Sequence, residues 1–457
     1  MSANRRRFLL RHPLCLLLIL WLTLGCEQTS QLHRIQQQQI LHVALLQPPA
    51  YQQLHNQPGF EQELIQSFAD TLGLSIQWHP VTTPDQITTL LRQARVHLAI
   101  GLLRTPANQL YLQFSDSYRT AHLRLAYRYG APKPRSLTKL PDTLYVAETS
   151  GIPPTRLTAQ YPQLHTRIWP VTEDSNLFAA LNQGHVLYAL AHADALALAQ
   201  PFYPYLTPGP TVGKPQPLAW AFPVQDDDSL RQAANQFLHR WQTNGTLAHL
   251  TERYYGHLNR FGFVDKQRFR RHLRERFPRY RAWFQQAAQQ TGLDWRILAA
   301  MGYQESHWRA NAVSPTGVRG LMMLTHPTAR QLGIRDRTDP QQSILGGARY
   351  LQSLMRRLPE RISGEDRLWL AIASYNVGLG HVEDARVLTE RQGGNPNLWH
   401  QVKQRLPLLR QKRFYRTLKY GYARGDEPVT YVDNIRYYYD MLTWYEQHPE
   451  ALAKTPE

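Results

Sequence analysis

Cysteine is nearly absent from this sequence. The 457 residues include two cysteines, Cys15 within an apolar run and Cys26 directly after Gly25. Removal of the residues up to Gly25 would leave one cysteine, so a framework of disulfide bonds is excluded. Hydrophobic residues make up 42% of the chain, which predicts globular domains with apolar cores rather than disorder. The length suits two or three such domains.

Acidic residues are also scarce. The chain has 34 Asp and Glu against 52 Lys and Arg, a formal net charge of +18. A basic surface favours polyanions such as nucleic acid, anionic lipid headgroups or cell-wall polymers. Because the first residues predict export, we expect no nucleic-acid partner. A solvated basic surface without a specific partner is the other interpretation, and charge alone does not decide between them.

Long hydrophobic runs are missing after residue 24. The apolar run at 14–24 follows Arg5, Arg6, Arg7 and Arg11 and precedes the small residue Gly25. It has about half the ~20 residues that a membrane-spanning helix needs. Basic residues, a short apolar run and a small residue are typical of a secretory signal. We therefore expect residues 1–25 to be a signal peptide.

The residues around Cys26 resemble a bacterial lipobox, in which the cysteine becomes the acylated N-terminus. Thr23 and Leu24 depart from the preferred order of that motif, so an ordinary cleaved signal is the alternative. Residues 26–39 are polar and predict a tether. Glu27 is not the aspartate associated with inner-membrane retention. We expect a membrane-associated protein on the periplasmic face of the cell outer membrane, lipid-anchored or peripheral.

Residues 40–258 alternate short β-like runs with amphipathic stretches. The runs 41–46, 74–78 and 96–100 predict strands, and the apolar spacing over 60–72 predicts a helix that ends at Gly73. A β-α-β-α-β order implies parallel strands with right-handed crossovers. A similar set recurs over 143–190. This region is predicted to be an α/β domain of two lobes.

After residue 263 the pattern becomes helical almost to the end, which predicts an all-α second domain. No tandem repeat or low-complexity tract occurs. The predicted organisation is a signal peptide (1–25), a tether (26–39), a two-lobed α/β domain (40–258), a linker (259–268), an all-α domain (269–450) and a tail (451–457).

Glu305 lies near the end of a predicted helix. Asp294 is placed to cap a helix over 295–308, and Leu298, Met301 and Gly302 share a face with Glu305. Partial burial there would raise the pKa of the carboxyl group, which suits an acid that holds a proton near neutral pH. The alternative is a glutamate that points to solvent or pairs with an arginine.

Four short motifs occur in order around Glu305. They are Gln-Glu-Ser-His-Trp at 304–308, Ser-Pro-Thr-Gly-Val-Arg-Gly-Leu-Met-Met at 314–323, Ser-Tyr-Asn at 374–376 and Tyr-Val-Asp-Asn-Ile at 431–435. This succession resembles the goose-lysozyme-like lytic transglycosylases over about residues 269–442. The motifs at 304–308 and 320–325 look especially like the membrane-bound lytic murein transglycosylase F branch. The resemblance implies a lysozyme-like fold and cleavage of peptidoglycan glycan strands.

The resemblance also implies that Glu305 is the single catalytic acid. It would protonate the glycosidic oxygen between N-acetylmuramic acid and N-acetylglucosamine and then deprotonate the muramoyl 6-hydroxyl, which leaves a 1,6-anhydromuramoyl end. Conventional glycosidases use a second carboxylate, and none of the motifs supplies an obvious one. Asp336, Asp339 and Asp384 are present in sequence, with loop or surface roles favoured. No metal or organic cofactor is expected.

The other motif residues are expected to bind the substrate or shape the site. Gly317 and Gly320 permit close backbone approach or shape a turn. Tyr431 is expected to hydrogen-bond Glu305, with Ile435 packed beneath it. The candidate substrate-binding residues are Ser314, Met322, Met323, Tyr375, Asn376 and Tyr431. A turn-forming role for Ser314 and core roles for the aromatics are the alternatives.

Residues 40–258 resemble periplasmic solute-binding proteins of the amino-acid type, with the likeness carried by 59–64, 68–74 and 114–118. In that family an arginine binds the ligand carboxylate. The position that corresponds to this arginine falls near Asn108 in the present sequence. The arginine in this loop is Arg104, which does not align with that position. His192 holds the usual place of an aspartate, with Asp194 two residues beyond. The resemblance implies a sensor for a muropeptide or amino acid, and a retained scaffold is the alternative.

Three rival functions remain open on the sequence alone. A protein that only grips peptidoglycan would make no new glycan ends. A hydrolytic muramidase would make reducing ends instead of anhydro ends. A solute receptor of a transporter would require tight binding of an amino acid by residues 40–258.

Overall fold

The computed structural model describes residues 29–46, 59–147, 152, 154–169, 176–258, 262–315 and 317–453. The expected signal peptide and Cys26 lie outside these residues. Within the described ranges, no helix combines the length and the apolar character needed to cross a membrane.

The first lobe is built on a five-stranded sheet in the order β2-β1-β3-β10-β4. Its strands are β1 (Ile40–Leu46), β2 (Ser75–Val81), β3 (Leu98–Ile100), β4 (Leu112–Phe114) and β10 (Ala221–Pro223). The strands β1, β2 and β3 are parallel, as predicted. The strand β10 comes from much later in the chain and pairs antiparallel with β3 and β4.

Helices cover this first sheet. They are α2 (Gln31–Gln38), α4 (Phe60–Leu72), α5 (Pro84–Arg92), α9 (Ser229–Thr243) and α10 (Thr246–Tyr255). The predicted helix over 60–72 is confirmed, with Phe60, Leu64 and Phe68 buried. Gly73 ends it in the left-handed conformation (φ 70°), a conformation that glycine adopts without steric cost.

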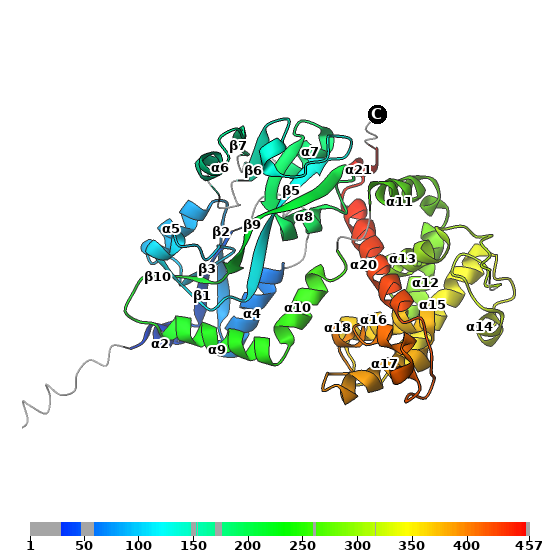
Figure 1. Cartoon of the computed structure of the whole chain (residues 1–457). Helices are drawn as coiled ribbons and strands as arrows, with labels where there is room; N and C mark the ends of the chain where they lie inside the picture. The colour runs from blue at the N-terminus through cyan, green and yellow to red at the C-terminus, as the bar shows by residue number, and fades with distance from the viewer. Residues whose placement is uncertain are drawn as a thin grey trace, which may run out of the picture.

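The second lobe has a five-stranded sheet in the order β7-β6-β8-β5-β9. Its elements are β5 (Arg119–Arg128), β6 (Leu144–Ala147), α6 (Pro154–Gln160), β7 (Thr166–Trp169), α7 (Leu177–Gln183), β8 (Tyr188–His192), α8 (Ala193–Ala199) and β9 (Leu206–Leu218). The long antiparallel pair β5 and β9 carries the chain into this lobe and back again. The predicted two-lobed α/β fold is confirmed (Figure 1).

The rest of the chain is helical. It comprises α11 (Phe263–Glu275), α12 (Arg281–Thr291), α13 (Trp295–Ser306), α14 (His326–Gln331), α15 (Pro340–Arg357), α16 (Gly364–Val377), α17 (Leu379–Arg391), α18 (Trp399–Val402), α19 (Lys412–Tyr415), α20 (Asp426–Gln447) and α21 (Glu450–Ala453). Short 3₁₀ helices are η1 (Asn108–Leu110), η2 (Leu137–Lys139), η4 (Phe277–Arg279) and η5 (Leu406–Arg410). The long helix α20 packs against α13 and α16, and its buried Ile435 and Met441 join the core with Met301.

Two segments differ from the sequence-based expectation. Residues 31–38, expected within a tether, form α2, because Ile35 is buried and the backbone N–H of Leu32 donates to the hydroxyl of Ser229 at 3.1 Å. The expected linker at 259–268 is helical from Phe263 onward. There the ring of Phe263 stacks on Tyr129 with centroids 3.8 Å apart. Both segments therefore pack on the α/β domain.

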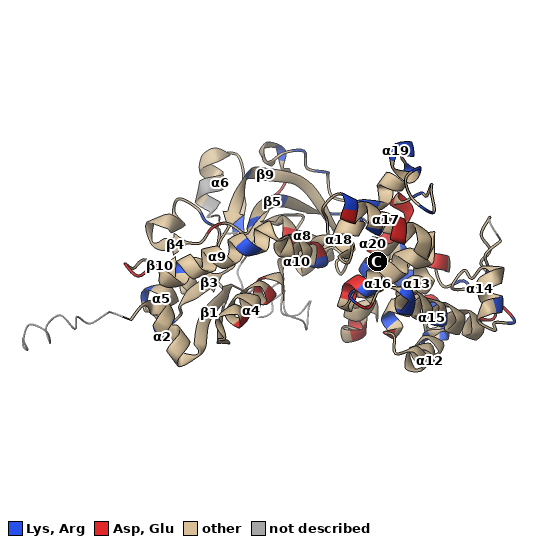
Figure 2. Cartoon of the chain, turned by 90° about the horizontal axis from the view of Figure 1, so that it is seen from below, with Lys and Arg blue, Asp and Glu red and all other residues tan. Residues whose placement is uncertain are grey.

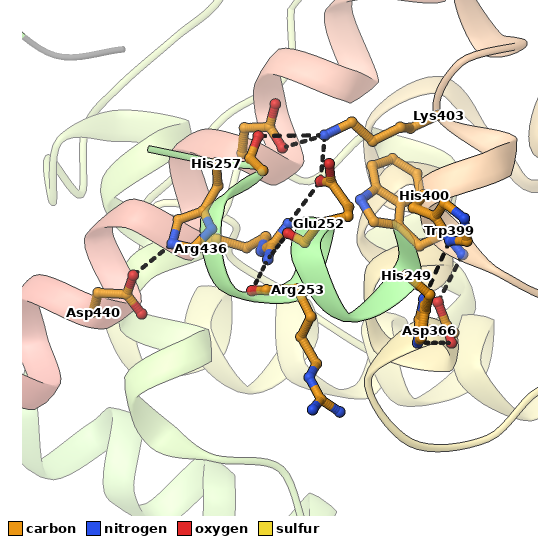
Figure 3. Close-up of polar contacts among 12 residues, drawn as sticks. His249, Glu252, Arg253, His257, Asp366, Trp399, His400, Lys403, Arg436 and Asp440 are labelled. Atoms are coloured by element: carbon orange, nitrogen blue, oxygen red, sulfur yellow. Dashed lines mark hydrogen bonds and ion pairs between the residues drawn. The ribbon is translucent and has the colours of Figure 1, made fainter. Parts of the chain in front are cut away.

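The two domains meet along α10, which faces the helical domain in Figure 1. Glu252 on α10 accepts hydrogen bonds from Lys403 at 2.5 Å and Arg436 at 3.3 Å. At one side of them His257 lies 2.6 Å from Asp440, and at the other His249 lies 3.6 Å from Asp366. Figure 3 shows these contacts side by side. The contacts along α10 are thus polar, with Arg436 and Asp440 supplied by α20, while Phe202 adds an apolar contact with Trp444 of α20, at 5.1 Å between ring centroids.

Candidate active site

Glu305 lies in the last turn of α13. Asp294 caps this helix by accepting the backbone N–H of Arg296 at 2.8 Å, as predicted. The helix ends at Ser306, two residues before the predicted end. The reason is that His307 and Trp308 take positive φ angles of 51° and 55°, which an α-helix cannot contain. The sharp stop leaves Glu305 beside the loop that follows.

The carboxyl group of Glu305 is half-buried, and its hydrogen-bond partner comes from α20. The hydroxyl of Tyr431 donates to Oε1 of Glu305, and Ile435 is buried one turn further along α20. Burial raises the pKa of Glu305 to about 7, although the hydrogen bond from Tyr431 acts to lower it. Burial disfavours the ionised form because it removes water from the carboxylate. Glu305 therefore holds a proton at close to neutral pH.

Tyr375 and Asn376 lie near Glu305, at the end of α16. The hydroxyl of Tyr375 donates to the carbonyl oxygen of Met322 at 2.8 Å. Burial raises the pKa of Tyr375 well above its ordinary value, and the nearby charge of Glu305 acts in the same direction. The side chain of Asn376 is exposed. Tyr375 thus links the α16 end to the loop after α13, and Asn376 is free to meet a ligand.

The loop from Ser314 to Met323 packs against α13. The hydroxyl of Ser314 accepts the backbone N–H of Val318 at 3.2 Å, a turn-forming contact. A Cβ added at Gly317 (φ 79°) would meet no atom within 4 Å, whereas a Cβ at Gly320 (φ 88°) would lie 1.7 Å from the carbonyl oxygen of Arg337. Gly317 therefore shapes the turn, and Gly320 permits the close approach of two backbones.

Met322, a candidate substrate-binding residue, is not exposed to a substrate. Its side chain is fully buried and fits against Gly302 and Gly347, where any added Cβ would meet it at 3.3 Å and 2.8 Å. Burying an apolar side chain against two glycines of neighbouring helices is more favourable than exposing it. Its carbonyl oxygen still meets Tyr375. Met323, with φ 47°, is only half-buried.

A cavity of about 330 Å³ lies beside Tyr431, lined by Gln304, Asn376, Asp426, Glu427, Thr430 and Tyr431. Asp426, Glu427 and Thr430 were not predicted from the sequence, and Gln304 appeared only as part of the 304–308 motif. Gln304 precedes Glu305 and accepts a hydrogen bond from Asn434 at 3.1 Å. Glu427 stands four residues before Tyr431, so helical spacing places both on one face of α20. That spacing was the signal in the sequence from which Glu427 could have been found.

The aspartates considered as second carboxylates have structural roles. Asp336 accepts from Thr338, and Asp339 caps α15 through the backbone N–H of Gln342. Asp384 is buried and accepts two backbone N–H groups. In contrast, Asp426 and Glu427 line the cavity, and they pair with Arg410 and Arg424. The side chains of the first pair are about half exposed, and those of the second pair are exposed by 70% and 58%.

The α/β domain has a cavity of about 160 Å³ between its lobes. It is lined by residues of both lobes, including Glu61, Arg119, His192, Asp194 and Tyr255. Arg119 pairs with Asp194, and its guanidinium lies 4.8 Å from the ring centroid of Phe60 and 4.2 Å from that of Tyr255. Arg104 instead points to the carbonyl oxygen of Ser115 at 3.5 Å. The arginine that faces the cavity is thus Arg119, which directly follows the segment 114–118.

A metal site is not apparent in the part of the chain that the structure describes. It holds no group of three His, Cys, Asp or Glu residues arranged to bind a metal ion.

Two family models match the chain, one for each domain. Residues 42–257 match the family of bacterial extracellular solute-binding proteins, family 3, and residues 282–397 match the transglycosylase SLT domain. An ancestral amino acid-binding protein, a precursor of cyclohexadienyl dehydratase, aligns over 50% of this chain and 100% of its own, with 22% identity and a TM-score of 0.42.

Relatives resemble the chain over most of its length. A protein named membrane-bound lytic murein transglycosylase F from Alteromonas mediterranea is 42% identical over 399 residues, which cover 85% of this chain and 86% of the relative. A protein of the same name from Marinobacter nauticus is 40% identical over 444 residues, or 94% of this chain and 86% of that relative. The similarity thus spans both domains.

Proposed function

The chain belongs to the membrane-bound lytic murein transglycosylase F family, and we propose that Glu305 alone provides the acid and the base of its reaction. It is a peptidoglycan lytic transglycosylase with an N-terminal solute-binding-like domain. The observation that supports the role of Glu305 is its half-buried carboxyl group, whose pKa is raised to about 7 and which accepts a hydrogen bond from Tyr431.

In the proposed reaction the protonated Glu305 donates its proton to the oxygen that links N-acetylmuramic acid to N-acetylglucosamine. The bond from the anomeric carbon to that oxygen breaks, and the N-acetylglucosamine end leaves with a hydroxyl group. The carboxylate then removes the proton of the muramoyl 6-hydroxyl as its oxygen bonds to the anomeric carbon. The product is a 1,6-anhydromuramoyl end, and Glu305 regains its proton, so the site is ready for another cycle.

The neighbouring residues position this chemistry. Tyr431 holds one carboxyl oxygen of Glu305 and so directs the other toward the substrate. Asn376 lines the cavity beside it and binds the sugar chain. Tyr375 fixes the loop that carries Met323 through its bond to the Met322 carbonyl oxygen, and Ser314 shapes the same loop. Met323 offers its half-buried side chain to the glycan.

The substitution Glu305→Gln tests the proposal because it keeps the shape of the side chain and removes the proton donor. We expect release of anhydromuramoyl products from purified sacculi to fall by a factor of about 10³ or more, measured by mass spectrometry of the digest. Glu446→Gln, an exposed residue of the same domain, is the matched control and should retain activity.

The products also separate the rival functions. Asp426 and Glu427 line the cavity and are carboxylates that could activate water in a hydrolytic reaction. Reducing ends in place of anhydro ends would establish hydrolysis and defeat the transglycosylase proposal. A protein that only binds sacculi would release neither product.

We further propose that the N-terminal domain binds a muropeptide or an amino acid between its lobes. The support is the cavity where Arg119 and Asp194 meet, since a guanidinium and a carboxylate suit the two charged ends of such a ligand. Calorimetry on the whole chain with free amino acids and with muropeptides tests this. Absence of binding by both would leave the domain as a scaffold.

Membrane association is proposed through acylation of Cys26, on the periplasmic face of the outer membrane. The relatives carry "membrane-bound" in their name, and the residues before Cys26 fit a cleaved signal. Labelling with a fatty-acid analogue tests it, with Cys26→Ser as the control. Labelling that survives this substitution, or that never occurs, would contradict the anchor.

A further inference from the structure

The segment between α17 and α20 carries a strong excess of positive charge. Residues 391–425 contain nine Lys and Arg residues and no Asp or Glu. We call residues 410–424 the basic loop. It includes α19, which lies at an outer end of the helical domain and whose Lys and Arg residues are blue in Figure 2.

Several cations of the basic loop are exposed and lack an acidic partner. Among the described residues, the side chains of Lys412, Arg416 and Lys419 are exposed and take part in no ion pair. Two large aromatics are exposed beside them, Tyr420 by 51% and Tyr422 by 54%. Nζ of Lys419 lies 5.4 Å from the ring centroid of Tyr420, and exposed aromatics beside cations that lack an acidic partner suit contact with an anionic ligand.

The basic loop is held firmly on the helical domain. The carboxylate of Asp384 accepts the backbone N–H groups of Lys419 and Tyr420 at 3.1 Å and 2.8 Å. The ring of Tyr420 lies so close to Gly380 that an added Cβ there would meet it at 2.6 Å. The guanidinium of Arg391 donates to the carbonyl oxygen of Thr417 at 3.2 Å. The cations are therefore presented on a fixed backbone.

The basic loop also adjoins the active-site cavity. Arg410 pairs with Asp426, and Arg424 pairs with Glu427. Both acidic residues line the cavity beside Tyr431. A polymer that lies in the cavity and extends past the start of α20 therefore passes the two ends of the basic loop, Arg410 and Arg424.

The chemistry of the substrate explains such a surface. The sugars of a glycan strand are uncharged apart from the lactyl carboxylate of peptide-free muramoyl residues, whereas its stem peptides carry further free carboxylates. We propose that the basic loop binds the carboxylates of the stem peptides, so that the preferred substrate is a peptide-bearing strand. This inference rests on the proposed function. Charge complementarity of this kind adds affinity and specificity at the rim of a site.

The test reverses three charges, in the whole chain with Lys412→Glu, Arg416→Glu and Lys419→Glu together. Cleavage is compared on peptide-bearing strands and on strands freed of peptides by an amidase. We expect kcat/KM on peptide-bearing strands, relative to that on peptide-free strands, to fall about tenfold. The control Arg92→Glu, Lys214→Glu and Arg240→Glu changes the same charge at exposed sites of the other domain and should leave the ratio unaltered.

A measurement on the unaltered protein tests the same inference. Added salt should weaken cleavage of peptide-bearing strands by the unaltered protein more than cleavage of peptide-free strands, because salt screens exposed charges. An unchanged ratio in the triple variant together with an equal effect of salt on both substrates would overturn the inference.

Binding without cleavage separates this inference from the proposed function. Co-sedimentation of Glu305→Gln protein with sacculi, with and without the three charge reversals, measures how much the basic loop contributes to binding. This measurement works even if no substrate is cleaved. Vesicles of phosphatidylglycerol test the other source of anionic groups. Loss of vesicle binding with sacculus binding intact would show a lipid-binding surface and overturn the inference.

Discussion

The carboxyl group of Glu305 is subject to two opposing influences, and the balance sets a pH dependence. Burial raises its pKa to about 7, and the hydrogen bond from Tyr431 lowers it. An acid that must be protonated loses activity as the pH rises through its pKa, so kcat/KM should fall above about pH 7. In Tyr431→Phe the lowering contact is gone. The pKa should then rise, and the decline should move to higher pH, while kcat falls about tenfold through poorer positioning.

A pH–rate profile of both proteins measures this shift. Tyr445→Phe is a suitable control, because Tyr445 is buried in α20 further from Glu305 along the helix. A decline that stays at the same pH in Tyr431→Phe would mean that Tyr431 does not act on the proton of Glu305.

Two glycines of the loop after α13 should respond differently to the same change. Both have positive φ angles, but a Cβ at Gly320 would lie 1.7 Å from the carbonyl oxygen of Arg337, while Gly317 has open space around it. Gly317→Ala should cost about 1 kcal/mol from backbone strain alone. Gly320→Ala should cost more than about 3 kcal/mol, because the two backbones must separate. Unfolding curves of the two variants compare them, and equal losses would contradict the close approach.

At the scale of the element, local signals in the sequence were reliable. The helix at 60–72 and the cap at Asp294 were predicted because apolar spacing and capping residues act within a few positions. The meeting of Glu305 with Tyr431 was predicted only through the family resemblance. The two lie 126 positions apart, and no local rule brings such residues together.

Other features depend on contacts between distant elements. The helix α2 forms on a polar sequence because Ile35 and Leu32 find partners on α9. Arg119 faces the lobe cavity because β5 passes between the lobes. Asp426 and Glu427 became site residues only when the start of α20 was placed beside Asn376. Composition carries no information on any of these placements, and spacing relates only Glu427 to Tyr431, four residues further along α20.

At the scale of the molecule, α10 lies between the cavity of the α/β domain and the helical domain. Its Tyr255 lines the cavity between the lobes, and its Glu252 accepts from Lys403 and Arg436 of the helical domain. Arg436 lies on α20, which also carries Tyr431. A shift of α10 that follows lobe closure would therefore reach the helix that positions Glu305, through packed elements rather than a loose linker.

Glu252→Ala tests whether this interface holds the domains together. Glu252 is 21% exposed and Arg436 only 4%, so the substitution leaves the buried Arg436 without its carboxylate, a loss of about 3 kcal/mol. Amide hydrogen exchange in α10 and α20 should then become about 100-fold faster. Glu446→Ala removes an exposed partner of Arg281 within the helical domain and should change exchange little. Equal effects of the two substitutions would show that the α10 contact contributes no more than a surface ion pair, and the route from the lobes to Tyr431 would then have no mechanical basis.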